Sequence, residues 1–205
     1  MRSILLVLSL FVVGALTPAV VAQDQPSEYA TLLASLKDGK TDIDYTRLRL
    51  SYMDSPEYKA ATDVSKSEDA MSDALNKKDY PAALKYAEAV LASDYVNIDA
   101  HFVAMEANRQ MGAIDKAQYH ITVFRGLIDS IRSSGDGKSI EKAWVVINVH
   151  EEYVLLRVLG FRPSEQSLLQ KDGHAYDVMK VKNTEDGAEQ TFYFNVDIPF
   201  KHYGF

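Results

Sequence analysis

Residues 77–94, KKDYPAALKYAEAVLASD, decide how this chain is expected to fold. Their apolar residues recur at steps of three and four, which is the spacing of one face of an α-helix. These residues are Ala83, Leu84, Ala87, Val90 and Leu91. Pro81 falls in the first turn of such a helix, where a missing backbone N–H is tolerated. The stretch therefore predicts an amphipathic helix that begins near Pro81.

The same pattern returns further along the chain. Lys78–Ala83 aligns with Gly112–Ala117 at an offset of 34 residues, the period of tetratricopeptide repeats. Residues 64–128 resemble two such repeats, each a pair of packed helices. They depart from that family at His101, where it prefers Trp, and at Tyr95, where it prefers a closing Pro. The alternative is two ordinary helical hairpins whose spacing is coincidental.

Helical spacing also occurs on both sides of this stretch. It marks residues 29–36, 42–53, 97–112 and 114–131, with Asn97 as a helix cap. A turn-rich segment, Ser133–Lys138, then interrupts the pattern. We therefore expect a tetratricopeptide-like helical region over residues 27–132.

After that break, the residue pattern changes from helical spacing to strand-like runs. Ala143–Val149 is β-branched and apolar, which predicts a buried strand. A short helix is expected over 151–159, closed by Gly160 and Pro163, and two strand-like runs at 174–182 and 190–196 predict a hairpin. The fold class is therefore α+β: a helical N-terminal layer, then a small antiparallel or mixed sheet with one helix over residues 139–205.

Composition and charge exclude several classes of protein. The 205 residues include 22 Lys+Arg and 29 Asp+Glu, so the formal charge of −7 argues against a nucleic-acid binder. The chain has no cysteine, which excludes disulfides, thiolate nucleophiles and cysteine-ligated metals.

The N-terminus reads as a secretory signal peptide over residues 1–22. Arg2 precedes an apolar run from Ile4 to Leu16, and Val20 and Ala22 fit a cleavage site after Ala22. A retained membrane anchor is the alternative. We expect export to the periplasm or the medium, with no membrane span after cleavage.

Several motifs together resemble one protein family. They are TDIDYTRLRLSY (41–52), SPEY (55–58), AWVVI (143–147), EEY (151–153) and FYFN (192–195). This set resembles domain-of-unknown-function family 4919, a family of exported bacterial proteins, over about residues 40–205. The resemblance implies that residues 27–205 form one family-level domain, and it implies no activity, substrate or catalytic residue.

Two groups of residues are candidates for binding. If the repeats are real, the first helix of the second repeat presents Asp99, Phe102, Glu106, Arg109 and Gln110 to a peptide or protein partner. A solvated helix face is the alternative for this group. Tyr45, Arg49 and Tyr52 share a helix face and are suited to recognising a carboxylate, whereas a structural Arg paired with an acid is the alternative.

A metal or acid–base site is a weaker candidate. His150, His174 and His202 lie in the last third of the chain, with Glu151, Glu152 and Asp177 near them in sequence. Their spacings are not those of a known ligand motif, and ordinary hydrogen-bonded histidines are the alternative.

These observations favour a non-enzymatic, exported interaction or scaffold protein with a protein or peptide partner and no cofactor. An extracytoplasmic hydrolase or metal-dependent enzyme, with its site in the C-terminal region, is the alternative. A third hypothesis is a binder of small molecules or glycans that uses some of the 12 tyrosines.

Overall fold

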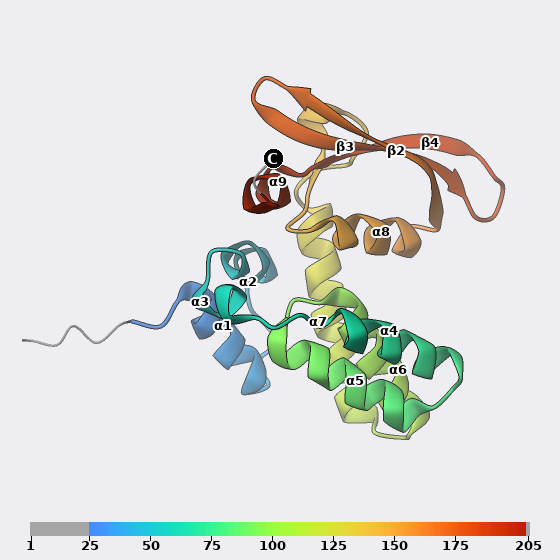
Figure 1. Ribbon diagram of the computed structural model, residues 1–205. Helices are drawn as coiled ribbons and strands as arrows, with labels where there is room; N and C mark the ends of the chain where they lie inside the picture. The colour runs from blue at the N-terminus through green and yellow to red at the C-terminus, as the bar shows by residue number, and fades with distance from the viewer. Residues whose placement is uncertain (1–24, 204–205) are drawn as a thin grey trace, which may run out of the picture.

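The computed structural model describes residues 25–203, in which the helices come first and the sheet follows (Figure 1). The helices ahead of the sheet are α1 (Glu28–Lys37), α2 (Tyr45–Tyr52), α3 (Pro56–Ala60), α4 (Ser65–Asn76), α5 (Tyr80–Ser93), α6 (Ile98–Gln110) and α7 (Ile114–Arg132). The predicted α+β class is confirmed. The signal peptide expected at residues 1–22 lies outside the described residues.

Local sequence signals explain where α5 and α6 begin and end. The Asp79 side chain caps α5 by accepting the N–H of Ala82 (3.2 Å), and Pro81 occupies the first turn. Asn97 caps α6 in the same way, and Gly112 follows that helix with φ +80°. That φ favours glycine because it has no Cβ.

Helices α4 to α7 pack each against the next, and α4 also contacts α6. Small side chains fill much of the interface, because they let helix backbones approach closely. The fully buried alanines here are Ala83, Ala87, Ala100, Ala104 and Ala107. This packing suits two successive helical pairs, and the tetratricopeptide assignment itself stays a prediction.

The long helix α7 connects the helical layer to the rest of the molecule, contacting α6, α2 and β1 (Trp144–Val145). Gly126 lies within α7, where a Cβ would fall 2.4 Å from the ring of Tyr45 in α2. The ring of Tyr45 therefore rests directly on the α7 backbone. No helix within residues 25–203 is long and apolar enough to cross a membrane.

Within residues 25–203, the sheet has four strands in the order β1-β4-β3-β2. The strands after β1 are β2 (Phe161–Lys171), β3 (His174–Asn183) and β4 (Glu189–Asn195). The β3–β4 hairpin is confirmed, and β4 pairs in parallel with β1 as expected for a hairpin added to the Trp144 strand. Helix α8 (Val149–Val158) lies between the sheet and the helical layer, and α9 (Asp197–Tyr203) follows β4 (Figure 1).

Two expectations about this region are wrong. The strand expected over 143–149 is paired only at Trp144–Val145, because Asn148 already caps α8. Pro163 does not close a helix but lies in β2, which within residues 25–203 pairs only with β3 and so forms an edge of the sheet. Edge strands tolerate proline, and here the register shifts just after it, between Pro163 and Glu165. Because β2 is polar and mostly exposed, its sequence lacks the alternation of apolar and polar residues by which a half-buried strand is recognised.

Candidate functional site

Helix α8 carries two adjacent carboxylates, and both are buried. Glu151 is 2% exposed and Glu152 is 0% exposed. The Asn148 side chain accepts the Glu151 N–H (3.0 Å), and acidic residues in a first turn favour the positive end of the helix dipole. Because successive helical residues point about 100° apart, the two side chains reach different neighbours.

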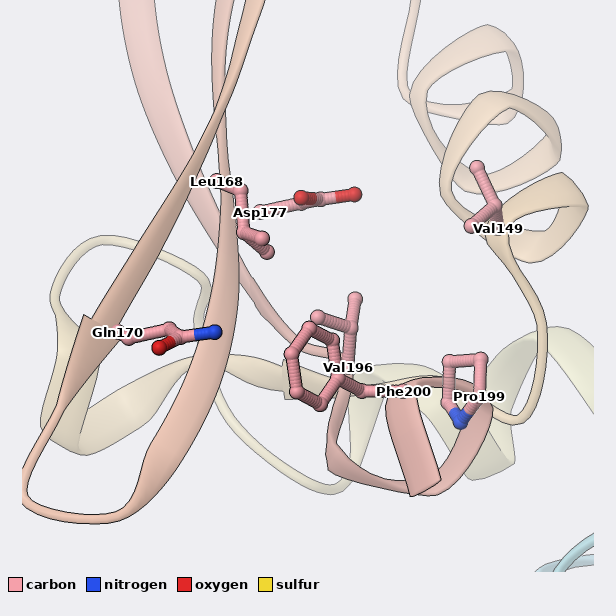
Figure 2. Close-up of a pocket in the computed structure, with 7 residues that line it drawn as sticks. All are labelled: Val149, Leu168, Gln170, Asp177, Val196, Pro199 and Phe200. Carbon is pink, nitrogen blue, oxygen red and sulfur yellow. The ribbon is translucent and has the colours of Figure 1, made fainter. Parts of the chain in front are cut away.

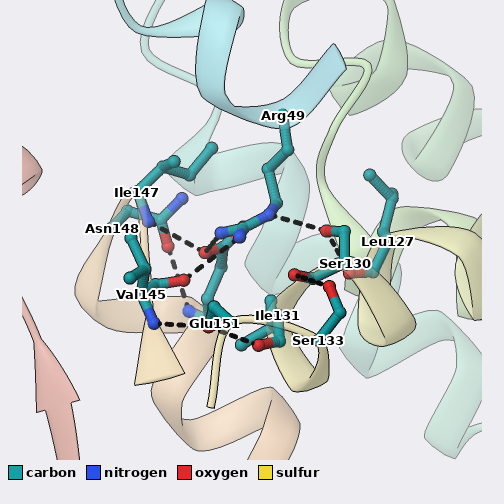
Figure 3. A network of polar contacts seen from close by, with 10 residues as sticks. Arg49, Leu127, Ser130, Ile131, Ser133, Val145, Ile147, Asn148 and Glu151 are labelled. Atoms are coloured by element: carbon teal, nitrogen blue, oxygen red, sulfur yellow. Dashed lines mark hydrogen bonds and ion pairs between the residues drawn. The ribbon is translucent and has the colours of Figure 1, made fainter. Parts of the chain in front are cut away.

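Glu151 contacts Arg49 of α2 (Figure 3). Nη1 of Arg49 lies 2.7 Å from Oε2 of Glu151, and both side chains are almost completely buried. Arg49 also donates from Nε to the Ser130 hydroxyl (2.8 Å) and from Nη2 to the Val145 carbonyl (3.1 Å). The Ile147 N–H donates to the same Glu151 oxygen (2.9 Å). This network ties α2, α7 and β1 to α8.

The sequence groups Arg49 with Tyr45 and Tyr52 as a recognition site for a carboxylate. The structure places the Arg49 guanidinium on the chain's own Glu151. Tyr52 is 4% exposed and donates to the Ser93 carbonyl (3.3 Å), and Tyr45 is half-buried against α7. The three side chains therefore face the interior of the protein.

Glu152 contacts the sheet, where it meets Asp177 of β3. Burial, and then the negative charge of Asp177, raises the pKa of Glu152 to about 9. No donor among the described residues reaches either Glu152 oxygen, so an ionised Glu152 would be buried without compensation. A protonated Glu152 instead has a hydrogen to give to the Asp177 carboxylate. Burial beside Asp177 therefore favours the protonated form of Glu152.

Asp177 is held from a second side by a chain of hydrogen bonds. Nε2 of Gln166 on β2 donates to Oδ2 of Asp177 (2.7 Å). The hydroxyl of Tyr153, on α8, donates in turn to Oε1 of Gln166 (2.6 Å). The hydrogen bond from Gln166 fixes the position of the Asp177 carboxylate. Asp177 is only 7% exposed, so this carboxylate is largely desolvated.

The Asp177 carboxylate points into an apolar pocket between the sheet, α8 and α9 (Figure 2). The pocket has a volume of about 490 Å³ and is lined by Val149, Leu168, Gln170, Asp177, Val196, Pro199 and Phe200. Of the described residues, Asp177 is the one charged member of that lining. Val149 and Leu168 are 39% and 53% exposed, so the pocket opens to solvent between them. Small-ligand sites are typically apolar cavities with a few precisely placed polar groups, and this pocket has that character.

Sequence reasoning missed this pocket, although a signal for it exists. Along β3, Ala175, Met179 and Val181 alternate on the buried face, and Asp177 takes the position between the first two. A carboxylate on an apolar strand face is costly, and such residues gather at functional sites. The partner, Glu152, carries no comparable signal, because a first-turn Glu is also what a solvated helix needs.

The three candidate metal-binding histidines are not brought together. Each faces a different aspartate, in the pairs His150–Asp99 (2.7 Å), His174–Asp197 (2.6 Å) and His202–Asp54 (3.9 Å). Across residues 25–203, no group of three or more His, Cys, Asp or Glu side chains is placed to hold a metal ion.

Asp99, expected on the partner-binding face of α6, is engaged by α8. His150 and Arg157 both pair with its carboxylate, which leaves the Asp99 side chain 17% exposed. The hydrogen bond to Asp99 raises the pKa of His150, and the same bond helps lower the pKa of Asp99. This end of α6 is therefore an internal contact between α6 and α8.

The rest of the α6 face is open. Phe102 is 39% exposed, with its ring centre 6.0 Å from that of Phe124. Glu106 binds both Arg109 (2.6 Å) and Gln110 (2.8 Å), all on the same helix. This part of the face consists of one aromatic ring and a set of polar groups paired among themselves.

A protein-family model described as Domain of unknown function (DUF4919) matches residues 20–204. No curated protein and no solved structure matches this chain. The match spans both the helical layer and the sheet.

Proposed function

The chain belongs to the family described as Domain of unknown function (DUF4919), and from that premise we propose that it is an exported, non-enzymatic binding protein. Its ligand occupies the pocket between α8, α9 and the sheet. The observation that carries this proposal is the buried Asp177 carboxylate in a lining that is otherwise uncharged.

Binding rather than reaction suits the residues of the pocket. The lining has apolar side chains, one amide and one carboxylate, without a serine, threonine or histidine that would serve as a nucleophile or neutral base. Glu152, the partner of Asp177, is 0% exposed and so does not reach the ligand itself. What the pocket offers is apolar contact together with one fixed acceptor.

An apolar reporter tests this assignment. We expect the uncharged dye N-phenyl-1-naphthylamine to bind with a rise in fluorescence, and Leu168→Asp to weaken its binding by about tenfold or more, because a charge in the rim opposes apolar burial. Leu168 is 53% exposed, so the fold tolerates the change. The matched control is Ile114→Asp, which alters a 62% exposed residue at the start of α7 outside the pocket.

Equal dye binding by the two aspartate variants would contradict the pocket assignment. A hydrolase that uses the Glu152–Asp177 pair is the second candidate function, favoured by a carboxylic acid beside a carboxylate. Turnover of nitrophenyl esters or glycosides that is lost in Asp177→Asn would support the hydrolase and oppose a purely binding role.

Export is part of the proposal and is supported by the sequence of residues 1–22. Expression of the full chain in a bacterial host is expected to yield a processed protein that begins at Gln23, outside the cytoplasm. Ala22→Arg is expected to block processing, whereas Gln25→Arg is not. N-terminal sequencing of the fractions measures this, and an uncut chain in the membrane fraction would instead identify a retained anchor.

A protein partner that docks on α6 has weaker support. Phe102 offers exposed apolar area, but Asp99 already binds α8, and Glu106 pairs with its own neighbours. We therefore place the main ligand contact at the pocket and keep α6 as a secondary surface for a scaffold role.

A further inference from the structure

The pocket combines apolar walls with a fixed negative charge. The carboxylate that reaches the pocket belongs to Asp177, while Glu152 behind it is fully buried and its pKa is raised to about 9. Among the described residues, no cation lines the pocket to neutralise this carboxylate. Lys171 and Lys201 follow Gln170 and Phe200 in sequence, but both are exposed and neither lines the pocket. Asp197, which follows Val196, pairs with His174 (2.6 Å).

This arrangement discriminates among ligands by charge. An anionic ligand would be repelled by Asp177 in a low-dielectric site. A purely apolar ligand would cover the carboxylate without giving it a donor, which is unfavourable. A divalent metal ion is poorly served, because the lining contains a single carboxylate and one amide.

We infer that the pocket binds a small organic ammonium ion whose apolar body packs against Phe200, Val196 and Leu168 while its nitrogen contacts Asp177. This inference rests on the proposed binding function and names the class of ligand. A primary ammonium group has three N–H donors. One is directed to the Asp177 carboxylate, which lines the pocket.

Hydrogen bonds from the neighbouring side chains orient Asp177 for contact with the ammonium group. Gln166 donates to Oδ2, and Tyr153 fixes Gln166 in turn. The acceptor is thus oriented before the ligand arrives, which lowers the entropic cost of binding. The ring of Phe200 lines the same cavity (Figure 2) and offers a flat apolar surface to an aromatic ligand.

A set of three matched compounds tests the inference on the unaltered protein. They are 2-phenylethylamine, 2-phenylethanol and 3-phenylpropanoate, which share a ring and differ in charge. By calorimetry at pH 7, we expect the amine to bind about tenfold or more tightly than the alcohol, and the acid to bind more weakly than both. Asp177→Asn is expected to reduce amine affinity to that of the alcohol.

The matched control is Glu165→Gln, on the same sheet, where the carboxylate pairs with Lys180 at the surface (2.8 Å) and does not line the pocket. It should leave all three affinities unchanged.

If the amine and alcohol bind equally and Leu168→Asp weakens both, the ligand class is wrong while the binding function stands. If none of the three binds and the dye also fails to bind, the proposed function is wrong as well. The comparison among compounds needs no variant, so it remains decisive even if Asp177→Asn does not fold.

Discussion

Replacing Arg49 with methionine is expected to lower the free energy of unfolding by about 3–5 kcal/mol. The substitution would leave Glu151 buried without its cation, and it would also remove donors from Ser130 and the Val145 carbonyl. Burial already raises the pKa of Glu151, with Arg49 opposing that rise. Chemical denaturation at pH 7, read by circular dichroism, measures the loss.

The neighbouring Arg47 provides a matched control. It lies on the same helix and pairs with Glu28, but its side chain is 65% exposed. Exposed ion pairs contribute about 1 kcal/mol or less, so Arg47→Met should change stability little. In the Arg49→Met background, Glu151→Gln should recover part of the lost stability, because it removes the uncompensated charge. Equal effects of the two arginine substitutions would show that the buried network is not a stabilising anchor.

The second large effect concerns Glu152 and pH. Its carboxyl has an ordinary pKa of 4.5 and a pKa of about 9 in the folded protein. Between these values the folded protein holds a proton that the unfolded chain has lost, so stability falls as pH rises from about 4.5 to 9. One fully shifted group contributes a slope of about 1.4 kcal/mol per pH unit.

Glu152→Gln is expected to remove this contribution and to stabilise the protein at pH 8 by about 1.4 kcal/mol or more. Glutamine keeps the size of the side chain and an N–H donor for Asp177, and it does not ionise. Denaturation curves at several pH values between 5 and 9 give the two slopes. Glu165→Gln, at an exposed pair, should keep the slope of the unaltered protein. A slope unchanged by Glu152→Gln would mean that Glu152 is ionised in the folded state.

The parts of this fold that could be predicted are those specified locally. Helix α5 follows from its apolar steps and the position of Pro81, and β4 follows from the alternation around Phe192 and Phe194. Strand β2 could not be predicted, because an exposed edge strand has no apolar face to mark it.

The site was harder to predict because it depends on contacts between distant residues. Glu151 and Glu152 are adjacent in sequence and differ only in what α8 brings them against, Arg49 on one side and Asp177 on the other. Nothing local distinguishes them from two solvated first-turn acids. The three histidines looked like a group in sequence, whereas each has its own aspartate in the folded chain.

The edge strand β2 has a consequence for the self-association of this protein. A long free strand edge offers a row of backbone donors and acceptors on which another chain can grow into a fibril. Here that row contains Pro163, an irregular register beside it, and charged residues at Arg162, Glu165 and Lys171. Proline and charge are the devices by which natural sheets discourage such growth, so this edge is a poor template for amyloid-like stacking.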